Sequence, residues 1–366
     1  MKSLGKNLIK IWSILLLFSA LASAKEPLVL ASSSTWPANA DVYALAFSSD
    51  SQNVLSGDDA RYLSLWNVET GSRTAHWLEQ ADVITSVALS NNGKLAISAS
   101  QNGHIILRDS RDLSAAEPLA KDSPHGHNPI IALTRDGKTA ISGGEDGTIA
   151  LWDIEKSVKA GRFSENFPGR RNELPRRALP ENKTIHALAL SPITNIALIG
   201  SDNDSNGNNL WSVEVSTNPK KSSWSGLPPH PVTAIAFSHD GKKAMTGDSD
   251  GNLALWDVAK GKLIGDIWDG HKKSINAVAF SPDGKTALST SDSAVNEGTI
   301  KLWNLSSKER ELLAVLKDAG PSASAYAVAF SPNGKYAISG SGDKTIKLWD
   351  MAAIKKALEG PAKANP

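Results

Sequence analysis

A short motif recurs along this chain of 366 residues and constrains its fold more than any other feature. Each copy is a leucine, then usually tryptophan, then a polar residue. The copies are centred on Trp66, Arg108, Trp152, Trp211, Trp256, Trp303 and Trp349. Successive copies lie 42, 44, 59, 45, 47 and 46 residues apart. A period of this length indicates an array of similar units, each with room for four short strands.

The last copy shows what one unit encodes, in the stretch SPNGKYAISGSGDKTIKLWD at residues 331–350. Its Pro-Asn-Gly segment predicts a tight turn, because proline presets φ and Asn-Gly tolerates positive φ. Residues 336–339 then predict a short strand and 340–344 a second turn. Residues 345–349 alternate apolar and polar side chains, as a half-buried strand does. One such hairpin is marginally stable alone, so neighbouring units must bury it.

Seven copies with this spacing resemble the WD-repeat β-propeller family. The resemblance implies an all-β fold: a seven-bladed propeller over residues 25–352, with four antiparallel strands per blade. It also implies that a strand near the N-terminus completes the last blade, since an open ring leaves an unpaired edge. Residues 26–32 occupy the place of that closing strand, and a disordered leader is the alternative. Residues 353–366 are predicted to form a C-terminal tail that is helical up to Gly360-Pro361.

The first 24 residues have the pattern of a secretory signal peptide. Lys2, Lys6 and Lys10 precede an apolar run from residue 11 to 21, which is too short to span a bilayer as a permanent helix. Ala22-Ser23-Ala24 forms a small-residue cleavage site. We therefore expect cleavage after Ala24, no stable membrane span afterwards, and a periplasmic or secreted protein. The lack of cysteine fits a bacterial periplasm best. An uncleaved anchor is the alternative.

Family blades often contain a buried tetrad of His, Ser or Thr, Asp and Trp. The third unit is expected to form it with His127, Ser142, Asp146 and Trp152. Such a group superficially resembles a catalytic triad. Because it recurs at blade spacing, we interpret it as structural, since buried polar groups must be satisfied together. We find no nucleophile elbow, zinc-protease helix or phosphate-binding loop, so we expect no enzyme activity and no cofactor.

The other units match the tetrad unevenly. The fifth is expected to use His230, Thr246, Asp250 and Trp256. The sixth has His271 and Ser289, and the seventh has Ser339, Asp343 and Trp349 but no histidine. The second departs most, with Arg108 in place of tryptophan, and the fourth has Ile199 at the hydroxyl position.

The 59-residue interval contains an insertion rich in arginine and proline. Between residues 155 and 183 there are eight Lys or Arg and four Glu. The arginines that cluster around its prolines are Arg162, Arg170, Arg171, Arg176 and Arg177. Arginine offers planar, bidentate donors to carboxylates, so this loop is predicted to dock an acidic partner. A solvated loop without a partner is the alternative.

The polar stretch DNDSNGNN at residues 202–209 resembles the start of a calcium loop. Asp202, Asp204 and Asn206 would supply oxygen ligands and Gly207 the bend. The acid expected at the twelfth position is replaced by Val213. A plain polar turn is the alternative interpretation.

These features predict a non-enzymatic periplasmic scaffold or adaptor that binds protein or peptide partners on one propeller face and on the arginine-rich loop. The candidate face residues are Asp82, Asn128, Glu145, Asp248, Lys272 and Lys273. A net charge of +1 gives no reason to expect nucleic acid. We expect a monomer or a subunit of a complex. The alternative is an accessory subunit or enzyme with a cofactor in the channel. The strands predicted to line the axis contain mainly Ala, Val, Ile and Leu, which argues against it.

Overall fold

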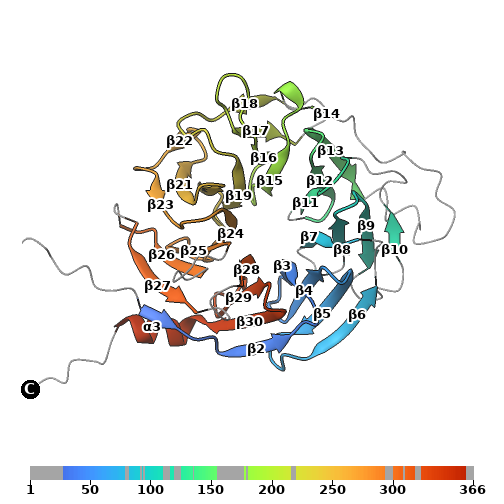
Figure 1. The fold of residues 1–366 in the computed structure, drawn as a ribbon, viewed down its shortest axis with the longest axis vertical. Coiled ribbons are helices and arrows are strands. Elements are labelled where there is room, and N and C mark those ends of the chain that lie inside the picture. The colour runs from blue at the N-terminus through green and yellow to red at the C-terminus, as the bar shows by residue number, and fades with distance from the viewer. Residues whose placement is uncertain are drawn as a thin grey trace, which may run out of the picture.

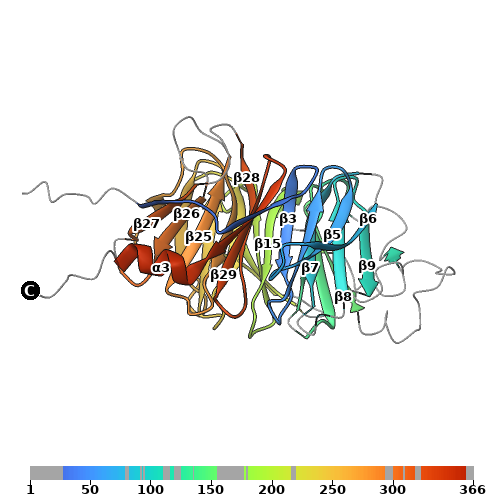
Figure 2. The same ribbon diagram turned by 90° about the horizontal axis from the view of Figure 1, so that it is seen from below.

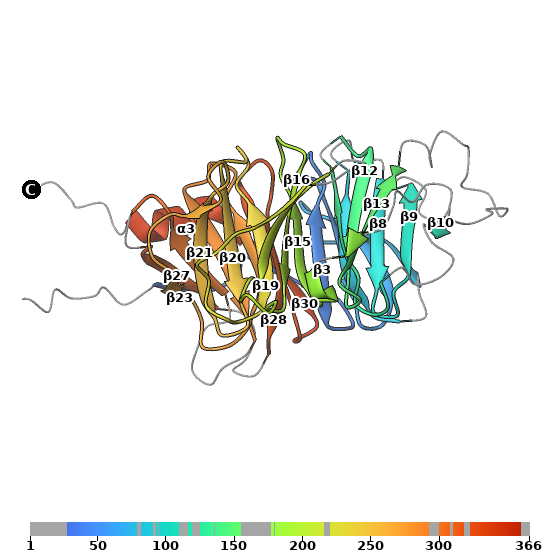
Figure 3. The same ribbon diagram turned by 90° about the horizontal axis from the view of Figure 1, so that it is seen from above.

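The computed structural model describes residues 28–359 except 79–81, 91–92, 94, 110–115, 119–124, 135, 155–176, 179, 216–219, 293–299, 308–309 and 318–322. The described residues form seven small sheets arranged as the blades of a ring (Figure 1). Seen edge-on, the ring is a disc with its strands running between two faces (Figures 2 and 3). The predicted seven-bladed all-β propeller is confirmed.

Each blade is a run of antiparallel strands, ordered from the axis to the rim. Blades 1 and 2 contain β3 (Val42–Phe47), β4 (Asn53–Asp58), β5 (Tyr62–Asn67) and β6 (Arg73–Leu78), then β7 (Ile84–Leu89), β8 (Leu95–Ser100), β9 (Ile105–Asp109) and β10 (Ala116–Pro118). Blades 3 and 4 contain β11 (Ile130–Leu133), β12 (Thr139–Gly143), β13 (Thr148–Asp153) and β14 (Arg177–Ala178), then, after the 3-10 turn η1 (Pro180–Asn182), β15 (Ile185–Leu190), β16 (Ile196–Ser201), β17 (Leu210–Glu214) and β18 (Lys221–Ser223).

Blades 5 to 7 follow the same order. Blade 5 contains β19 (Val232–Phe237), β20 (Lys243–Asp248), β21 (Asn252–Asp257), β22 (Lys262–Leu263) and β23 (Trp268–Asp269). Blade 6 contains β24 (Ile275–Phe280), β25 (Thr286–Ser291), β26 (Ile300–Asn304) and β27 (Leu312–Leu316), and blade 7 contains β28 (Ala325–Phe330), β29 (Tyr336–Ser341) and β30 (Thr345–Asp350).

A glycine near the end of the second strand lets adjacent blades pack closely. A Cβ added at Gly57 would lie 2.4 Å from Ile84 of the next blade, and one at Gly340 would lie 2.6 Å from Val42. Real side-chain atoms do not approach so closely, so only glycine fits. The core therefore lies between neighbouring blades, where the apolar faces of two sheets meet.

The N-terminal segment closes the ring, but not with the predicted residues. β2 (Ser34–Pro37) pairs antiparallel with β30 and is the outer strand of blade 7. β1 (Leu28–Leu30), within the range predicted to close the ring, instead pairs parallel with β27 and extends blade 6. The expectation for residues 26–32 is thus corrected: the chain crosses from one blade to the next before closing the last.

The helix α3 (Met351–Glu359) follows β30 directly. Asp350 caps its first turn, accepting hydrogen bonds from the backbone N–H groups of Ala352 and Ala353 at 2.8 and 3.0 Å. Ile354 is buried in a cluster that also includes Leu28 and Leu30 of β1. Both ends of the described chain therefore meet beside blades 6 and 7 (Figure 1).

Candidate functional site

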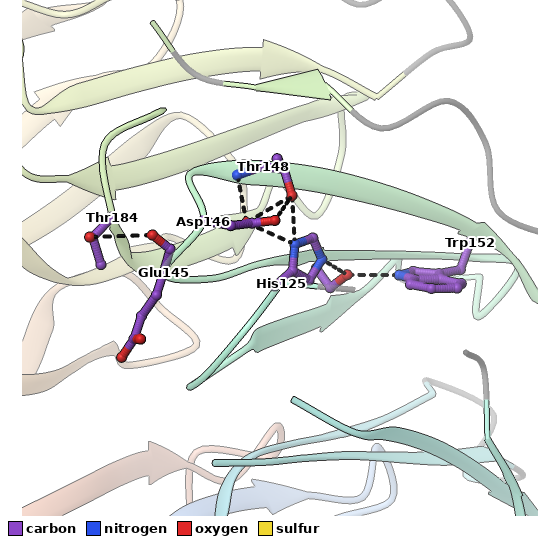
Figure 4. Close-up of polar contacts among 7 residues, drawn as sticks. His125, Glu145, Asp146, Thr148, Trp152 and Thr184 are labelled. Carbon is purple, nitrogen blue, oxygen red and sulfur yellow. Dashed lines mark hydrogen bonds and ion pairs between the residues drawn. The ribbon is translucent and has the colours of Figure 1, made fainter. Parts of the chain in front are cut away.

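The third blade contains a continuous buried hydrogen-bond network (Figure 4). Trp152 Nε1 donates a hydrogen bond to Ser142 Oγ at 2.8 Å. The Ser142 hydroxyl in turn donates to His125 Nε2, at 2.7 Å. His125 Nδ1 lies 2.9 Å from Thr148 Oγ1, and Thr148 donates in turn to Asp146. His125 and Ser142 are fully buried. The network fixes the blade's strands together, because breaking a bond at His125 or Ser142 would leave a buried polar atom unpaired.

The histidine of this network is His125, not the predicted His127. Gly126 has φ 72, which turns the backbone between the two residues. As a result His125 points inward against Gly144, where an added Cβ would lie 2.7 Å from the histidine Cβ. His127 is exposed at the surface. Ser142, Asp146 and Trp152 occupy the predicted places.

The network predicts how stability responds to acid. Burial raises the pKa of Asp146, but hydrogen bonds from His125 and Thr148 outweigh burial and hold this pKa at about 2. Because the pKa of Asp146 is lower in the folded state, the carboxylate stabilises the fold at pH values above its unfolded-state pKa, which is near 4. This contribution is lost as the pH falls to about 2. Asp146→Asn should therefore cost about 1–2 kcal/mol at pH 7, allowing for the partial exposure of the carboxylate. Urea unfolding at pH 7, 4 and 2.5 should show the difference shrinking, whereas the exposed Glu214→Gln should show none. A pH-independent difference would contradict the assignment.

A tryptophan indole donates to a hydroxyl in five blades. The pairs are Trp66–Ser56, Trp152–Ser142, Trp256–Thr246, Trp303–Ser289 and Trp349–Ser339, at 2.8 to 3.1 Å. In blade 7 the place of the missing histidine is filled by a buried lysine, since Lys347 Nζ lies 2.6 Å from Asp343. In blade 6, burial and the nearby charge of Lys301 lower the pKa of His271 to about 3, so this imidazole is neutral.

Two blades differ from the prediction. In blade 5, His230 and Asp250 lie 3.6 Å apart with exposed side chains and form no tetrad. In blade 7, Trp349 lies opposite Ala337, the second residue of the second strand. In blade 4, Trp211 lies opposite Ile199, the fourth residue of the second strand, and Val213 lies opposite the second residue. Val213 therefore occupies the usual tryptophan position. The displaced indole packs against blade 3, beside an isoleucine that could not have accepted its hydrogen bond.

Six of the seven inner strands contain a β-bulge at their second residue. The bulged residues form what we term the axial polar ring: Tyr43, Thr85, His186, Thr233, Asn276 and Tyr326. All are half-buried. Bulges commonly redirect a side chain at a barrel rim or near a functional site. The expectation of an apolar channel is thus corrected at this mouth. The sequence signal was a polar residue second in an otherwise apolar strand.

Members of the axial polar ring contact neighbouring blades. The rings of Tyr43 and Tyr326 stack with centroids 4.4 Å apart, joining blades 1 and 7. Burial and the contact with Tyr326 raise the pKa of Tyr43 to about 12. Thr233 Oγ1 donates to Ile275 O at 2.6 Å, and Asn276 Nδ2 donates to Ala325 O at 3.1 Å. This mouth of the ring is therefore built of preorganised polar groups.

Carboxylates surround the axial polar ring. They lie in the loops just before the inner strands and in the turns just after the second strands. We term them the acidic rim: Asp41, Asp59, Glu145, Asp202 and Asp292. Among the described residues, no lysine or arginine forms an ion pair with any of them. His186 Nε2 lies 2.7 Å from Asp202 Oδ1. Burial and the neighbouring Asp59 raise the pKa of Asp41, and the nearby charge of Lys344 offsets only part of this rise.

The predicted face residues lie on the same side of the disc, with one correction. Asp82, Asn128, Lys272 and Lys273 precede inner strands, and Glu145 follows β12, where it accepts a hydrogen bond from Asn128 Nδ2 at 2.7 Å. Asp248, in contrast, is only 4 % exposed. Its carboxylate binds the side chain and backbone N–H of Asn252, so it shapes a turn and offers no docking group.

The two predicted departures from the repeat have different outcomes. Arg162, Arg170, Arg171 and Arg176 lie outside the described residues, and Arg177 is described only as part of β14. In the Asp-Asn turn, Asp204 accepts hydrogen bonds from the backbone N–H groups of Asn206 and Asn208, while Asp202 turns to His186. Within the described part of the chain, no three His, Cys, Asp or Glu side chains gather as metal ligands. Calcium binding stays a prediction.

Comparison with known proteins agrees with this geometry. The family model for the WD domain, G-beta repeat, matches residues 30–67, 69–109, 119–153 and 310–350, and the Vps8 beta-propeller model matches 214–306. The chain contains WD40 repeats. The matches leave out residues 154–213, which include the arginine-rich insertion, the first two strands of blade 4 and its displaced Trp211.

Several curated proteins share parts of this chain. Over 131 residues it is 31% identical to small ribosomal subunit protein RACK1y of Oryza sativa subsp. japonica, covering 34% of this chain and 35% of the relative. Over 224 residues it is 26% identical to periodic tryptophan protein 2 of Arabidopsis thaliana, covering 61% and 23%. The aligned segments thus span about a third or less of these relatives. None of the helices in the described ranges is long and apolar enough to cross a membrane.

Proposed function

We propose that this protein is an exported, non-enzymatic scaffold that binds a segment of a partner protein at the mouth formed by the axial polar ring and the acidic rim. WD40 propellers are typically protein-interaction scaffolds and are generally non-enzymatic. The observation that carries the proposal is a set of five rim carboxylates that form no ion pair with a described lysine or arginine, around six half-buried polar side chains. Lys272 and Lys273 lie on the same side of the disc, but the five carboxylates outnumber them around the mouth, and charge complementarity there favours a basic partner segment.

Export rests on the leader at residues 1–24, which lies outside the described residues. The arginine-rich insertion would be a second docking element, for an acidic partner. Replacing Arg170, Arg171, Arg176 and Arg177 with alanine and comparing captured partners tests that element separately. Unchanged partners would remove the insertion from the proposal.

Affinity capture from the periplasm of the source cells tests the mouth. The variant Asp59→Asn/Glu145→Gln/Asp292→Asn should retain about tenfold less partner than the wild type, because several charges act together on association. A matched variant at the outer rim, Asp269→Asn/Glu311→Gln/Glu359→Gln, should retain the wild-type amount. Equal retention by both variants would contradict binding at the mouth. A chromophore that survives dialysis would instead favour the alternative of a cofactor in the channel.

A further inference from the structure

A groove of about 800 Å³ lies between blades 6 and 7, beneath α3. It is bounded by the turns that follow the inner strands β24 and β28, so it opens at the other end of the blades from the acidic rim. Figure 2 shows α3 on the outside of the ring beside β27. The groove is therefore separate from the mouth formed by the axial polar ring and the acidic rim.

The walls of the groove are apolar and come from three elements. Leu313 belongs to blade 6, Phe330 and Tyr336 belong to blade 7, and Met351 and Leu358 belong to α3. Each of these five side chains is only half-buried. Covering such a surface would remove apolar area from water, which favours association with an apolar ligand.

The edge of the groove is basic. Lys285, Lys335 and Lys355 line it from the blade 6 turn, the blade 7 turn and α3, and all three are exposed. Over the described ranges, none of the three forms an ion pair with an acid. The lining also includes two carboxylates, but each has a structural role: Asp283 accepts from Ser281 and a backbone N–H, and Asp350 caps α3.

We propose that this groove binds a short segment of a partner protein in which large apolar residues are flanked by Asp or Glu. Apolar residues would fill the space between α3 and the two blades, and the acidic residues would pair with the lysines. The lysines come from three separate elements, so complementarity needs several carboxylates. An acidic peptide supplies them, whereas a fatty acid has one. Recognition by apolar anchors in a groove, with a charged edge for specificity, is a recurring mode of peptide binding.

Fluorescence anisotropy with the full chain tests the proposal. The probe is a short fluorescein-labelled peptide with leucine and phenylalanine between glutamates. It should bind saturably and more weakly as salt is raised. The variant Lys285→Glu/Lys335→Glu/Lys355→Glu should weaken binding at least about tenfold. Lys356→Glu is a matched control for Lys355→Glu, since Lys356 is exposed on α3 but does not line the groove. It should leave affinity unchanged.

Further arms identify the occupant. Leu358→Ser, at the last turn of α3, should also weaken binding, with circular dichroism confirming that the variant is folded. The acidic-rim variant should bind this peptide as the wild type does, so failure here and failure of the proposed function are distinguishable. The proposal is overturned if the peptide does not bind or if the lysine reversals have no effect. It is also overturned if only oleate binds, or if the peptide binds only after residues 360–366 are removed, because the groove would then hold a lipid or the chain's own tail.

Discussion

Replacing Trp36 with alanine should destabilise the ring by about 3–5 kcal/mol, the range for deleting a large buried aromatic side chain. Trp36 is 2 % exposed and lies on β2, the closing strand of blade 7. Its ring stacks on Trp66 of blade 1, with centroids 6.0 Å apart. The substitution therefore weakens the contact that joins the last blade to the first. Urea unfolding followed by tryptophan fluorescence would measure the loss.

A control for Trp36→Ala lies a few residues away. Val29 is on β1 and is 61 % exposed, so Val29→Ala should change the free energy of unfolding by less than about 0.5 kcal/mol. Similar contacts between tryptophans connect other blades. Trp224 of blade 4 packs on Trp256 of blade 5, and Trp268 of blade 5 packs on Trp303 of blade 6. If Trp36→Ala were as mild as Val29→Ala, the closing role of β2 would be wrong.

His125→Ala should cost about 2–4 kcal/mol, because it leaves a cavity and deprives the fully buried Ser142 hydroxyl proton of its acceptor. His127→Ala, two residues along the same loop, should be neutral within about 0.5 kcal/mol since its side chain is exposed. Thermal unfolding of the two variants separates the assignments directly. A larger loss for His127→Ala would contradict the place of His125 in the buried network.

Much of the architecture was predictable from local and periodic features. The repeated Trp motif indicated the number of blades, and the Pro-Asn-Gly and related turns indicated where strands end. The pairing of tryptophan with a hydroxyl ten residues before it was also expected, and it is present between Trp152 and Ser142. These features depend on contacts within one hairpin, so the sequence of a single unit contains the information.

The errors occurred where a choice depended on neighbours. His125 and His127 are equally plausible in the sequence, and only the turn at Gly126 decides which one enters the blade. In blade 4, β17 pairs with β16 so that Val213 lies opposite Ala197, the place that tryptophan takes in other blades, and the Leu210-Trp211-Ser212 motif alone does not reveal this register. Asp248 was expected at the surface, yet its carboxylate is buried within a turn.

The period and the turn residues are local properties of the chain, so they suffice to predict a closed array of seven similar units. Which polar residues meet depends on how distant segments pack together. The axial polar ring comes from bulges in six separate strands, and the basic groove combines two blades with α3. Such sites join residues far apart in sequence, and their geometry depends on how blades pack around the axis.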